Sequence, residues 1–485
     1  MKTLITLSLI LSLSLNGYSQ TDLELVDRTL SRGDIKSHID FIASDELRGR
    51  QTGSPEIDIA AKYLASRMEA YGVQPIDGSY YQDVELVQTS YPTTLKWSFG
   101  DSTYDFEMIS GSRQNLDAKA IYLEYGTEAD FENVKVEGKI VVTKAGEAGD
   151  FDMMKSWYAS KDKIKRAQEN GALALLEIAP DDAQWIPIKN HVQHEKMVLK
   201  EEYSTSNFVH GWVEDSAGLI SNSLSPKKSF KSNILVEGIA NEEVKGKNVV
   251  GIIEGADAEL KDEYVIYSAH YDHIGVGQAN AEGDSIFNGA RDNAIGTVTL
   301  LSTAKNLGQF PTKRSALFIF FTAEEKGLLG SKYYVNHPLI PLNKMVYCFN
   351  SDNAGYNDTT KATIFGMEKS TNMELITKGA AAAGLEAIQD PIPEQKIYTR
   401  SDHYHFAQKG VPSVLYGVGV TAFDSVLMST YHQASDNPET LDFDYLEKFF
   451  RAYVYTARLI ANDSETPFWV EGDEYYEKGK ALYGE

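Results

Sequence analysis

The sequence is poor in cysteine, in basic residues and in long apolar stretches. Cys348 is the single cysteine among 485 residues, so no intramolecular disulfide can form and a large core must supply the stability. It lies in the apolar run KMVYCFNSD, which predicts a buried structural thiol rather than a nucleophile. The 46 basic and 70 acidic residues give a net charge of −24. This balance argues against binding to nucleic acid or to an anionic membrane, because both require a basic face.

Two common hydrolase signatures are also missing. No G-x-S-x-G segment is present, which argues against a serine hydrolase. No H-E-x-x-H segment is present either, because the pair His194-Glu195 lacks the second histidine. The sequence therefore argues against the serine-hydrolase design and against the H-E-x-x-H metallopeptidase design.

The first twenty residues, MKTLITLSLILSLSLNGYSQ, predict a secretory signal peptide of residues 1–19. Lys2 supplies the positive start, residues 4–15 form a short apolar run, and small residues precede the expected cleavage after Ser19. The run is short for a membrane span, and an uncleaved anchor is the alternative. We expect an exported protein, periplasmic or extracellular, without stable membrane insertion after the signal is removed.

The length and the changing pattern along the chain predict two domains. Residues 20–90 predict two helices and a strand, which form the first part of one domain. Residues 91–238 contain short strand-like runs between turns and predict an inserted, mostly β domain. Residues 239–485 alternate between strand and helix, which is typical of an α/β sheet covered by helices on both faces.

Residues that bind metals gather at the ends of the predicted strands of the last region, where active sites of such sheets form. They are His270 and Asp272 in YVIYSAHYDHIG, Asp292 in NGARDNAIG, Glu324 and Glu325 in FIFFTAEEKGLLG, Asp352 in MVYCFNSDNAG, and His432 in TYHQASDNPET. Two adjacent acids at the end of a buried strand are costly unless cations compensate their charge. The set therefore predicts a metal site.

The spacing within these motifs suggests separate roles. His270 and Asp272 are two residues apart in a strand and point to one face, while His273 is expected to point away. Asp292 could simply cap a helix, but its position makes it the candidate for bridging two metals. Glu324 and Glu325 diverge in direction, so one can bind a metal while the other faces an attacking water.

Two histidines and three carboxylates suit two Zn²⁺ ions per chain. A shared carboxylate would give each metal one histidine, one private acid and the bridging acid. Two such metals about 3.5–4 Å apart would lower the pKa of a bridging water. Glu324 would take the proton from that water and pass it to the leaving amine.

The ordered motifs SAHYDHIG, GARDNAIG, AEEKGLLGS, NSDNAG and YHQASDNPET resemble those of the M28 family of co-catalytic zinc peptidases over nearly the whole mature chain. The resemblance implies a three-layer α/β/α zinc-peptidase domain with a mixed, mostly parallel central sheet. It also implies that His270 and Asp352 hold one zinc, that Glu325 and His432 hold the other, and that Asp292 bridges them.

The same resemblance assigns further roles. Glu324 matches the general base, Asp272 the acid that supports the histidine ligand, and Tyr398 a tyrosine that helps to bind the oxyanion in some members. A cis peptide bond often follows the bridging aspartate, here between Asp292 and Asn293. Arg291 is a departure, because many members have aspartate at that position.

The segments NVKVEGKIVV and KRAQENGALALL of the inserted domain resemble the protease-associated (PA) domain. The resulting hypothesis is an exported di-zinc aminopeptidase acting on peptides, with domains at 20–90 and 239–485 around the insert. A carboxypeptidase of the same family is the alternative, since Arg291 and Arg400 could bind a substrate carboxylate. A glutaminyl cyclase would need only one zinc, and a non-catalytic binding protein would be expected to have lost ligands.

Overall fold

The structure is a computed structural model that describes residues 21–149, 151–180, 185, 189, 192–215 and 218–484. The predicted signal peptide lies outside the described residues. The chain divides into two compact units, one of Met1–Asp83 with Gly246–Glu485 and the other of Val84–Lys245. None of the helices in the described ranges combines the length and the apolarity that crossing a membrane requires.

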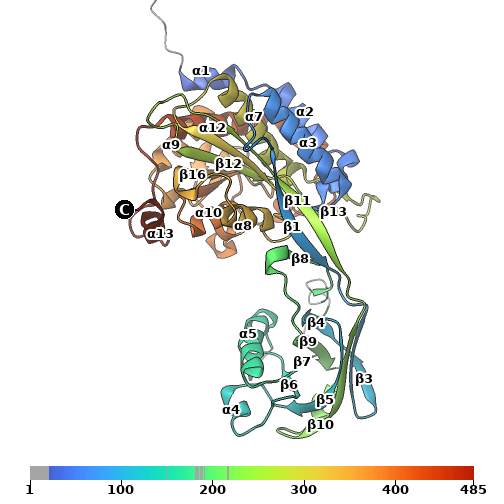
Figure 1. Ribbon diagram of the computed structural model, residues 1–485. Helices are drawn as coiled ribbons and strands as arrows, with labels where there is room; N and C mark the ends of the chain where they lie inside the picture. The colour runs from blue at the N-terminus through green and yellow to red at the C-terminus, as the bar shows by residue number, and fades with distance from the viewer. Residues whose placement is uncertain are drawn as a thin grey trace, which may run out of the picture. The chain divides into compact units, whose positions relative to one another are not determined.

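Within the described residues, the larger sheet has nine strands in the order β18-β17-β19-β16-β12-β15-β11-β1-β8 (Figure 1). The strands are β1 (Tyr81–Thr89), β8 (Lys196–Leu199), β11 (Asn241–Ile253), β12 (Tyr264–His270), β15 (Ser315–Phe321), β16 (Met345–Asn350), β17 (Lys361–Phe365), β18 (Glu386–Ile388) and β19 (Ser413–Val418). The neighbours β15, β12, β16 and β19 run parallel, whereas β11 and β17 pair antiparallel with β15 and β19. The mixed sheet with a parallel centre confirms the predicted fold class.

Helices cover this sheet on both faces. They are α1 (Asp22–Asp27), α2 (Arg32–Ile42), α3 (Pro55–Ala70), α7 (Gly296–Gln309), α8 (Leu329–Asn336), α9 (Met373–Ala382), α10 (His403–Gln408), α11 (Ser425–Met428), α12 (Phe443–Asn462) and α13 (Tyr476–Tyr483). A short pair, β13 (Gly275–Val276) and β14 (Ile286–Phe287), lies in a loop outside the sheet.

The side chains of β15 show how the layers form, because alternate residues of a strand point to opposite faces. Phe318 and Phe320 belong to the core shared with α2, α3, α7, α9 and α12. Leu317, Ile319 and Phe321 belong to the core shared with α8 and α10. A strand buried on both faces reads as a continuous apolar run, which explains why SALFIFF carries no alternation in its sequence.

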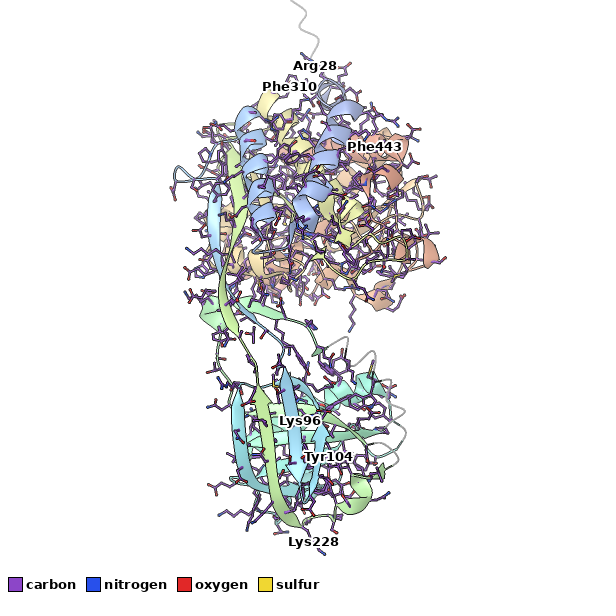
Figure 2. All side chains as sticks on the ribbon, turned by 90° about the vertical axis from the view of Figure 1, so that its right-hand side faces the viewer. Arg28, Lys96, Tyr104, Lys228, Phe310 and Phe443 are labelled. Carbon is purple, nitrogen blue, oxygen red and sulfur yellow. The ribbon has the colours of Figure 1, made fainter. Side chains whose placement is uncertain are left out.

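The first helix, α1, is capped at its N-terminal end and contacts the end of α7 at its C-terminal end. Thr21 and Glu24 form a reciprocal capping box at its start. At its end the Arg28 guanidinium lies 4.9 Å from the centre of the Phe310 ring, next to the end of α7 (Figure 2).

The second unit is built on an eight-stranded sheet within the described residues, in the order β3-β2-β10-β5-β6-β7-β9-β4. Its elements are β2 (Thr94–Phe99), β3 (Ser102–Asp105), β4 (Glu107–Ser110), β5 (Gln114–Tyr122), α4 (Glu128–Phe131), β6 (Ile140–Lys144), α5 (Met153–Glu169), β7 (Ala174–Pro180), β9 (Val209–Asp215) and β10 (Ser229–Glu237). Trp97, Phe99 and Tyr104 pack together at one side, with Phe99 and Tyr104 stacked at 5.4 Å (Figure 2). This mostly β sheet agrees with the fold predicted for the insert.

A buried ionic network centred on Glu177 of β7 lies inside the second unit. Glu177 accepts hydrogen bonds from Lys163 Nζ at 2.8 Å, from His210 Nε2 at 2.8 Å and from Trp212 Nε1 at 3.2 Å. Burial alone would raise the pKa of Glu177, but the contacts with His210 and Lys163 lower it to about 2. The ionised carboxylate is therefore part of the folded state of this unit.

We expect Glu177→Gln to lower the free energy of unfolding of the second unit by about 3–5 kcal/mol, because it leaves the Lys163 ammonium buried without its partner. Chemical denaturation followed by tryptophan fluorescence measures this, since four of the five tryptophans lie in residues 84–245. Glu169→Gln, which removes an exposed i,i+4 pair with Lys165, is the control and should change little.

The same network gives the expected pH dependence. The folded pKa of Glu177 is lowered from 4.5 to about 2, so its contribution is present above pH 4.5 and is lost as the pH falls toward 2. Wild-type stability of the second unit should therefore decline more steeply than that of Glu177→Gln over this window. Equal slopes would contradict the assignment of the ionised state.

Candidate active site

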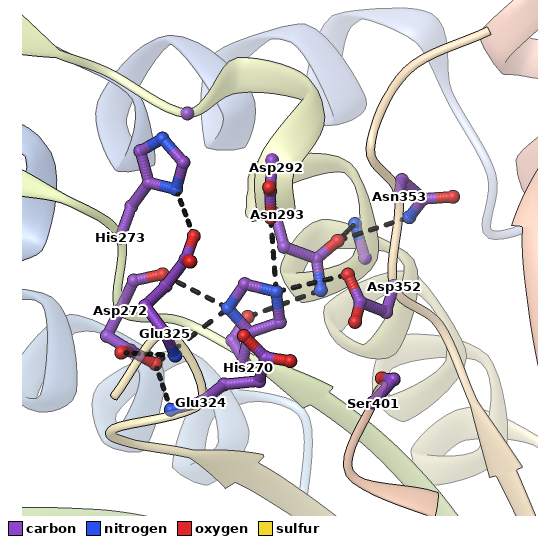
Figure 3. Close-up of polar contacts among 12 residues, drawn as sticks. His270, Asp272, His273, Asp292, Asn293, Glu324, Glu325, Asp352, Asn353 and Ser401 are labelled. Carbon is purple, nitrogen blue, oxygen red and sulfur yellow. Dashed lines mark hydrogen bonds and ion pairs between the residues drawn. The ribbon is translucent and has the colours of Figure 1, made fainter. Parts of the chain in front are cut away.

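The predicted metal-type residues meet at one edge of the larger sheet. His270 is the last residue of β12, Glu324 and Glu325 follow β15, and Asp352 follows β16. Because β15, β12 and β16 are parallel neighbours, their carboxyl ends share this edge. Figure 3 shows these side chains converging with that of Asp292, which comes from the turn Ala290–Ile295 before α7.

Asp292 faces a different histidine with each of its two carboxylate oxygens. Its Oδ1 lies 3.2 Å from Nε2 of His270, and its Oδ2 lies 3.2 Å from Nε2 of His432. The same His270 nitrogen lies 3.1 Å from Asp352 Oδ1, and the same His432 nitrogen lies 3.3 Å from Glu325 Oε2. The five predicted ligands thus form two sets that share only Asp292.

The donor atoms fit a pair of metal ions. Imidazole nitrogen and carboxylate oxygen are donors that Zn²⁺ accepts. Bonds of about 2.0–2.2 Å place neighbouring tetrahedral ligands about 3.3 Å apart. The four nitrogen–oxygen distances above lie between 3.1 and 3.3 Å. Two groups of described residues are close enough to hold a metal ion, His270/Glu324/Asp352 and His273/Asp292/Glu325, and they have no residue in common.

The pKa shifts of the site residues show that positive charge beside the carboxylates is favoured. Burial disfavours ionised Asp292, but hydrogen bonds from His270 and His432 lower its pKa well below the usual range. Burial likewise opposes charge on His432, yet contacts with Asp292 and Glu325 raise the pKa of His432 to about 10. Both shifts reflect a need for positive charge beside the carboxylates, which metal cations held by these residues would supply.

Glu324 lies within reach of the first set but is bonded to none of it. One of its oxygens lies within 4.8 Å of ligand atoms of His270 and Asp352. Burial, reinforced by the charges of Asp352 and Glu325, raises the pKa of Glu324 well above its usual value. Glu324 therefore lines the cavity as a buried carboxyl beside the predicted ligands, and its role as general base stays a prediction.

Asp272 holds the strand end of His270 and the Glu324–Glu325 segment together. Its carbonyl oxygen lies 3.1 Å from His270 Nδ1, while its Oδ1 accepts from the Glu324 backbone at 3.1 Å. Its Oδ2 accepts from Thr52 Oγ1 at 3.1 Å, and the same Thr52 oxygen accepts from Ala323 N. The backbone carbonyl of Asp272 thus contacts the imidazole of His270, whereas its carboxylate lies 3.8 Å from Nδ1 and binds the Glu324 segment and Thr52. Support of the histidine by the Asp272 carboxylate stays a prediction.

His273 was expected to point away from the site, and this prediction is wrong. Its Nδ1 lies 2.7 Å from Glu325 Oε1, the oxygen that does not face His432. The expectation extended strict strand alternation past His270, but β12 ends at that residue and the chain turns. His273 therefore orients Glu325, or joins the second metal group.

Other predicted residues lie elsewhere. Tyr398 is buried, its hydroxyl donates to the carbonyl of Ser413 at 3.2 Å, and it does not line the cavity. Its position does not support the predicted contact with the oxyanion.

The bond between Asp292 and Asn293 is cis, as expected. Arg291 turns into the protein and pairs with Asp436 at 2.9 Å, whereas Arg400 is exposed at the cavity.

Two functional supports were not foreseen from the sequence. Arg50 is fully buried and donates to the carbonyl oxygens of Tyr271, Asn288 and Gly289, next to the segments that carry His270 and Asp292. Thr52, two residues on, contacts Asp272. Both lie in the loop RGRQTG between two helices, whose polar composition is that of an ordinary solvated loop.

A cavity of about 450 Å³ opens beside the metal-type residues. Asp292, Glu324, Glu325, Asp352 and His432 form its polar wall. Its other wall is apolar and includes Phe365, Ile397, Leu415, Val420, Phe423 and Leu427. Arg400 donates to the Tyr431 hydroxyl at 3.1 Å, and the Tyr431 ring stacks on His432 at 4.1 Å. The cavity can therefore hold an apolar side chain next to the metal-type residues.

Comparisons with known proteins agree with this site. Residues 248–457 match the model described as Peptidase family M28. A probable leucine aminopeptidase 2 of Aspergillus oryzae is 25% identical, with 90% of this chain and 89% of that protein covered. Aminopeptidase YwaD of Bacillus subtilis is 23% identical, with 76% and 73% covered.

Two solved structures share the fold. An aminopeptidase from Aneurinibacillus sp. strain AM-1 has a TM-score of 0.61 at 19% identity, with 92% of this chain and 97% of that chain covered. A structure described as BSAP, a zinc aminopeptidase from Bacillus subtilis, has a TM-score of 0.50 at 17% identity, with the same coverage. The segment that matches the M28 family model, residues 248–457, holds all five predicted metal ligands.

Proposed function

We propose that this protein is an exported di-zinc aminopeptidase that releases apolar amino acids from the N-terminus of peptides. The observation that carries the proposal is the geometry of Asp292, whose two oxygens each face a different histidine at 3.2 Å. Each histidine also faces a private carboxylate, Asp352 or Glu325. Zinc ions held by these residues would supply Lewis-acid activation of water and of the substrate carbonyl.

The chain's own residues perform the proton transfers in this proposal. Glu324 takes the proton from the attacking water and delivers it to the leaving amine, since it lines the cavity with an oxygen within 4.8 Å of the His270 and Asp352 ligand atoms. Asp272 keeps Glu324 in place through its contact with the Glu324 backbone. His273 keeps Glu325 oriented toward His432.

The cavity walls support the choice of substrate. The apolar wall formed by residues such as Phe365, Leu415 and Phe423 suits a large apolar side chain at the cleaved residue. Four carboxylates also line the cavity, but two bound Zn²⁺ ions would offset their charge, so the aminopeptidase orientation rests on the relatives rather than on the charge of the site. The curated relatives reported above are aminopeptidases, which agrees with this orientation.

The carboxypeptidase alternative depends on Arg400 as the residue that would bind a substrate carboxylate. Arg400 is exposed, and among the described residues that line the cavity it is the one basic residue of the lysine or arginine type. Arg291, the other arginine considered, is buried against Asp436 and Thr440 and cannot reach a substrate. A carboxypeptidase would therefore depend on Arg400 alone for binding a terminal carboxylate.

We expect the protein to hydrolyse leucyl-aminomethylcoumarin and to leave its N-acetylated form intact. A chelator should abolish this activity, and added Zn²⁺ should restore it. The parallel substrate is an N-blocked dipeptide with a free carboxylate, assayed with wild type and Arg400→Gln. Cleavage of the blocked dipeptide alone, lost in Arg400→Gln, would establish the carboxypeptidase instead.

Two further parts of the proposal concern the rest of the chain. Residues 1–19 act as a cleaved signal peptide that directs the protein to the periplasm or the exterior. The Val84–Lys245 unit is a PA-type domain, a proposal supported by its mostly β sheet and by the two motifs quoted above. Export is measured by N-terminal sequencing of the secreted protein, where a start at Gln20 is expected.

A further inference from the structure

His432 is held differently from the other four predicted ligands. His270, Asp292, Glu325 and Asp352 have side chains exposed by 1–14%, whereas that of His432 is exposed by 38%. His432 belongs to no helix or strand, and its φ of 53° lies in the left-handed region, which a non-glycine residue adopts only at some cost. Its position must therefore be fixed by contacts of the surrounding loop.

Asp436, four residues after His432, attaches this loop to the segment that carries Asp292. Its carbonyl oxygen accepts from the Ala290 backbone at 3.0 Å. Its Oδ2 accepts from the backbone of Arg291 at 2.9 Å and of Asp292 at 3.2 Å. Three consecutive N–H groups of the Asp292 segment are thus attached to the residue that ends the His432 loop.

The Arg291 side chain completes the attachment. Its Nη1 donates to Asp436 Oδ1 at 2.9 Å and to Thr440 Oγ1 at 2.7 Å, and its Nη2 donates to the Thr440 carbonyl at 2.9 Å. Its guanidinium also lies 5.2 Å from the centre of the Tyr356 ring. Arg291 and Asp436 are both buried, so the pair is shielded from solvent and each charge depends on the other.

We propose that Arg291 and Asp436 act as positioning residues that set the affinity of the metal ion held by His432 and Glu325. The inference rests on the proposed two-metal site. The pair joins the loop of His432 to the segment of the shared ligand Asp292, so it fixes the distance between two ligands of the same ion. The ion held by His270 and Asp352 takes those two ligands from strand ends and meets this pair only through the shared Asp292, so its affinity should respond less.

The test is a zinc titration of the full-length protein in chelator-buffered solutions, with metal content per chain measured at each free zinc concentration. We expect two binding steps in wild type. In Arg291→Gln the weaker step should shift to a free zinc concentration about tenfold or more higher, while the other step shifts less. Asp436→Asn, which keeps an acceptor for the backbone N–H groups but loses the charge, should shift the same step.

Arg314→Gln is the matched control. Arg314 is buried and has the same kinds of partner as Arg291, namely a carboxylate, a backbone carbonyl and a threonine hydroxyl, in Glu263, Asp463 and Thr466. It precedes β15, at the opposite end of the strand from Glu324. Its loss should lower the melting temperature of the metal-free protein and leave both zinc steps unchanged.

A double-mutant comparison identifies the ion that responds. His432→Ala should lose one binding step, and Arg291→Gln added to it should then shift the remaining step less than Arg291→Gln alone shifts the weaker step. Unchanged zinc steps in Arg291→Gln, or equal shifts of both steps, would overturn the positioning role. A single binding step in wild type would instead contradict the two-metal proposal itself.

Discussion

Replacement of Glu324 by glutamine is expected to lower kcat by about 10²–10⁴-fold, because the amide cannot take a proton from water. The substitution preserves the size of the side chain. Glu324 is not among the residues whose oxygens face His270 or His432 at 3.1–3.3 Å, so the metal content should stay at the wild-type value. Steady-state kinetics with leucyl-aminomethylcoumarin and elemental analysis of the same sample measure both quantities.

The neighbouring residue provides the comparison for Glu324→Gln. Glu325→Gln weakens the contact between Glu325 and His432, so activity and zinc should be lost together. Loss of activity with full zinc in one variant, and loss of both in the other, would separate the base from the ligand. Wild-type kcat in Glu324→Gln would exclude Glu324 as the base.

Replacement of Asp292 by alanine is expected to remove both metal ions and all peptidase activity. The reason is that Asp292 offers one oxygen to the His270 set and the other to the His432 set. Each set would keep one histidine and one carboxylate, which is fewer protein ligands than zinc sites normally have. Elemental analysis after dialysis at a fixed free zinc concentration measures the loss.

Single-set variants show whether Asp292 is shared. Asp352→Ala and His432→Ala each remove a ligand from one set, so each protein should retain one ion at a free zinc concentration that saturates wild type. Circular dichroism of all three metal-free proteins controls for misfolding. If Asp292→Ala retained one ion with the affinity found in His432→Ala, the carboxylate would belong to one metal and the bridging role would be wrong.

The central strands and helices could be predicted from the sequence because their apolar patterns are long. β15 is a seven-residue run with every side chain buried, and α12 is a twenty-residue amphipathic helix. Strands β17 and β18 were not predicted. They have five and three residues, and β18 is only partly buried, so neither produces a pattern that stands out from a loop.

The ligand set could be predicted because metal-type side chains follow strand ends, and the strand ends are visible in the sequence. The supports of that set could not. Thr52 and Asp436 approach the site across 220 and 144 residues of chain, from Asp272 and Asp292 respectively. His273 was misjudged because alternation holds only inside a strand. Tyr398 was assigned by resemblance alone, and its hydroxyl is used by Ser413.

The buried guanidinium of Arg50 connects the candidate site to a segment that precedes the inserted unit in the sequence. Its carbonyl partners at Tyr271 and Gly289 are 221 and 239 residues away, on the far side of the inserted unit. Every predicted ligand and the predicted base lie after Gly246 in the sequence. The loops that carry His270 and Asp292, however, are bound by the side chain of Arg50, which precedes the inserted unit in the sequence. These contacts can therefore form only after residues on both sides of the insertion in the sequence have been synthesised and have met.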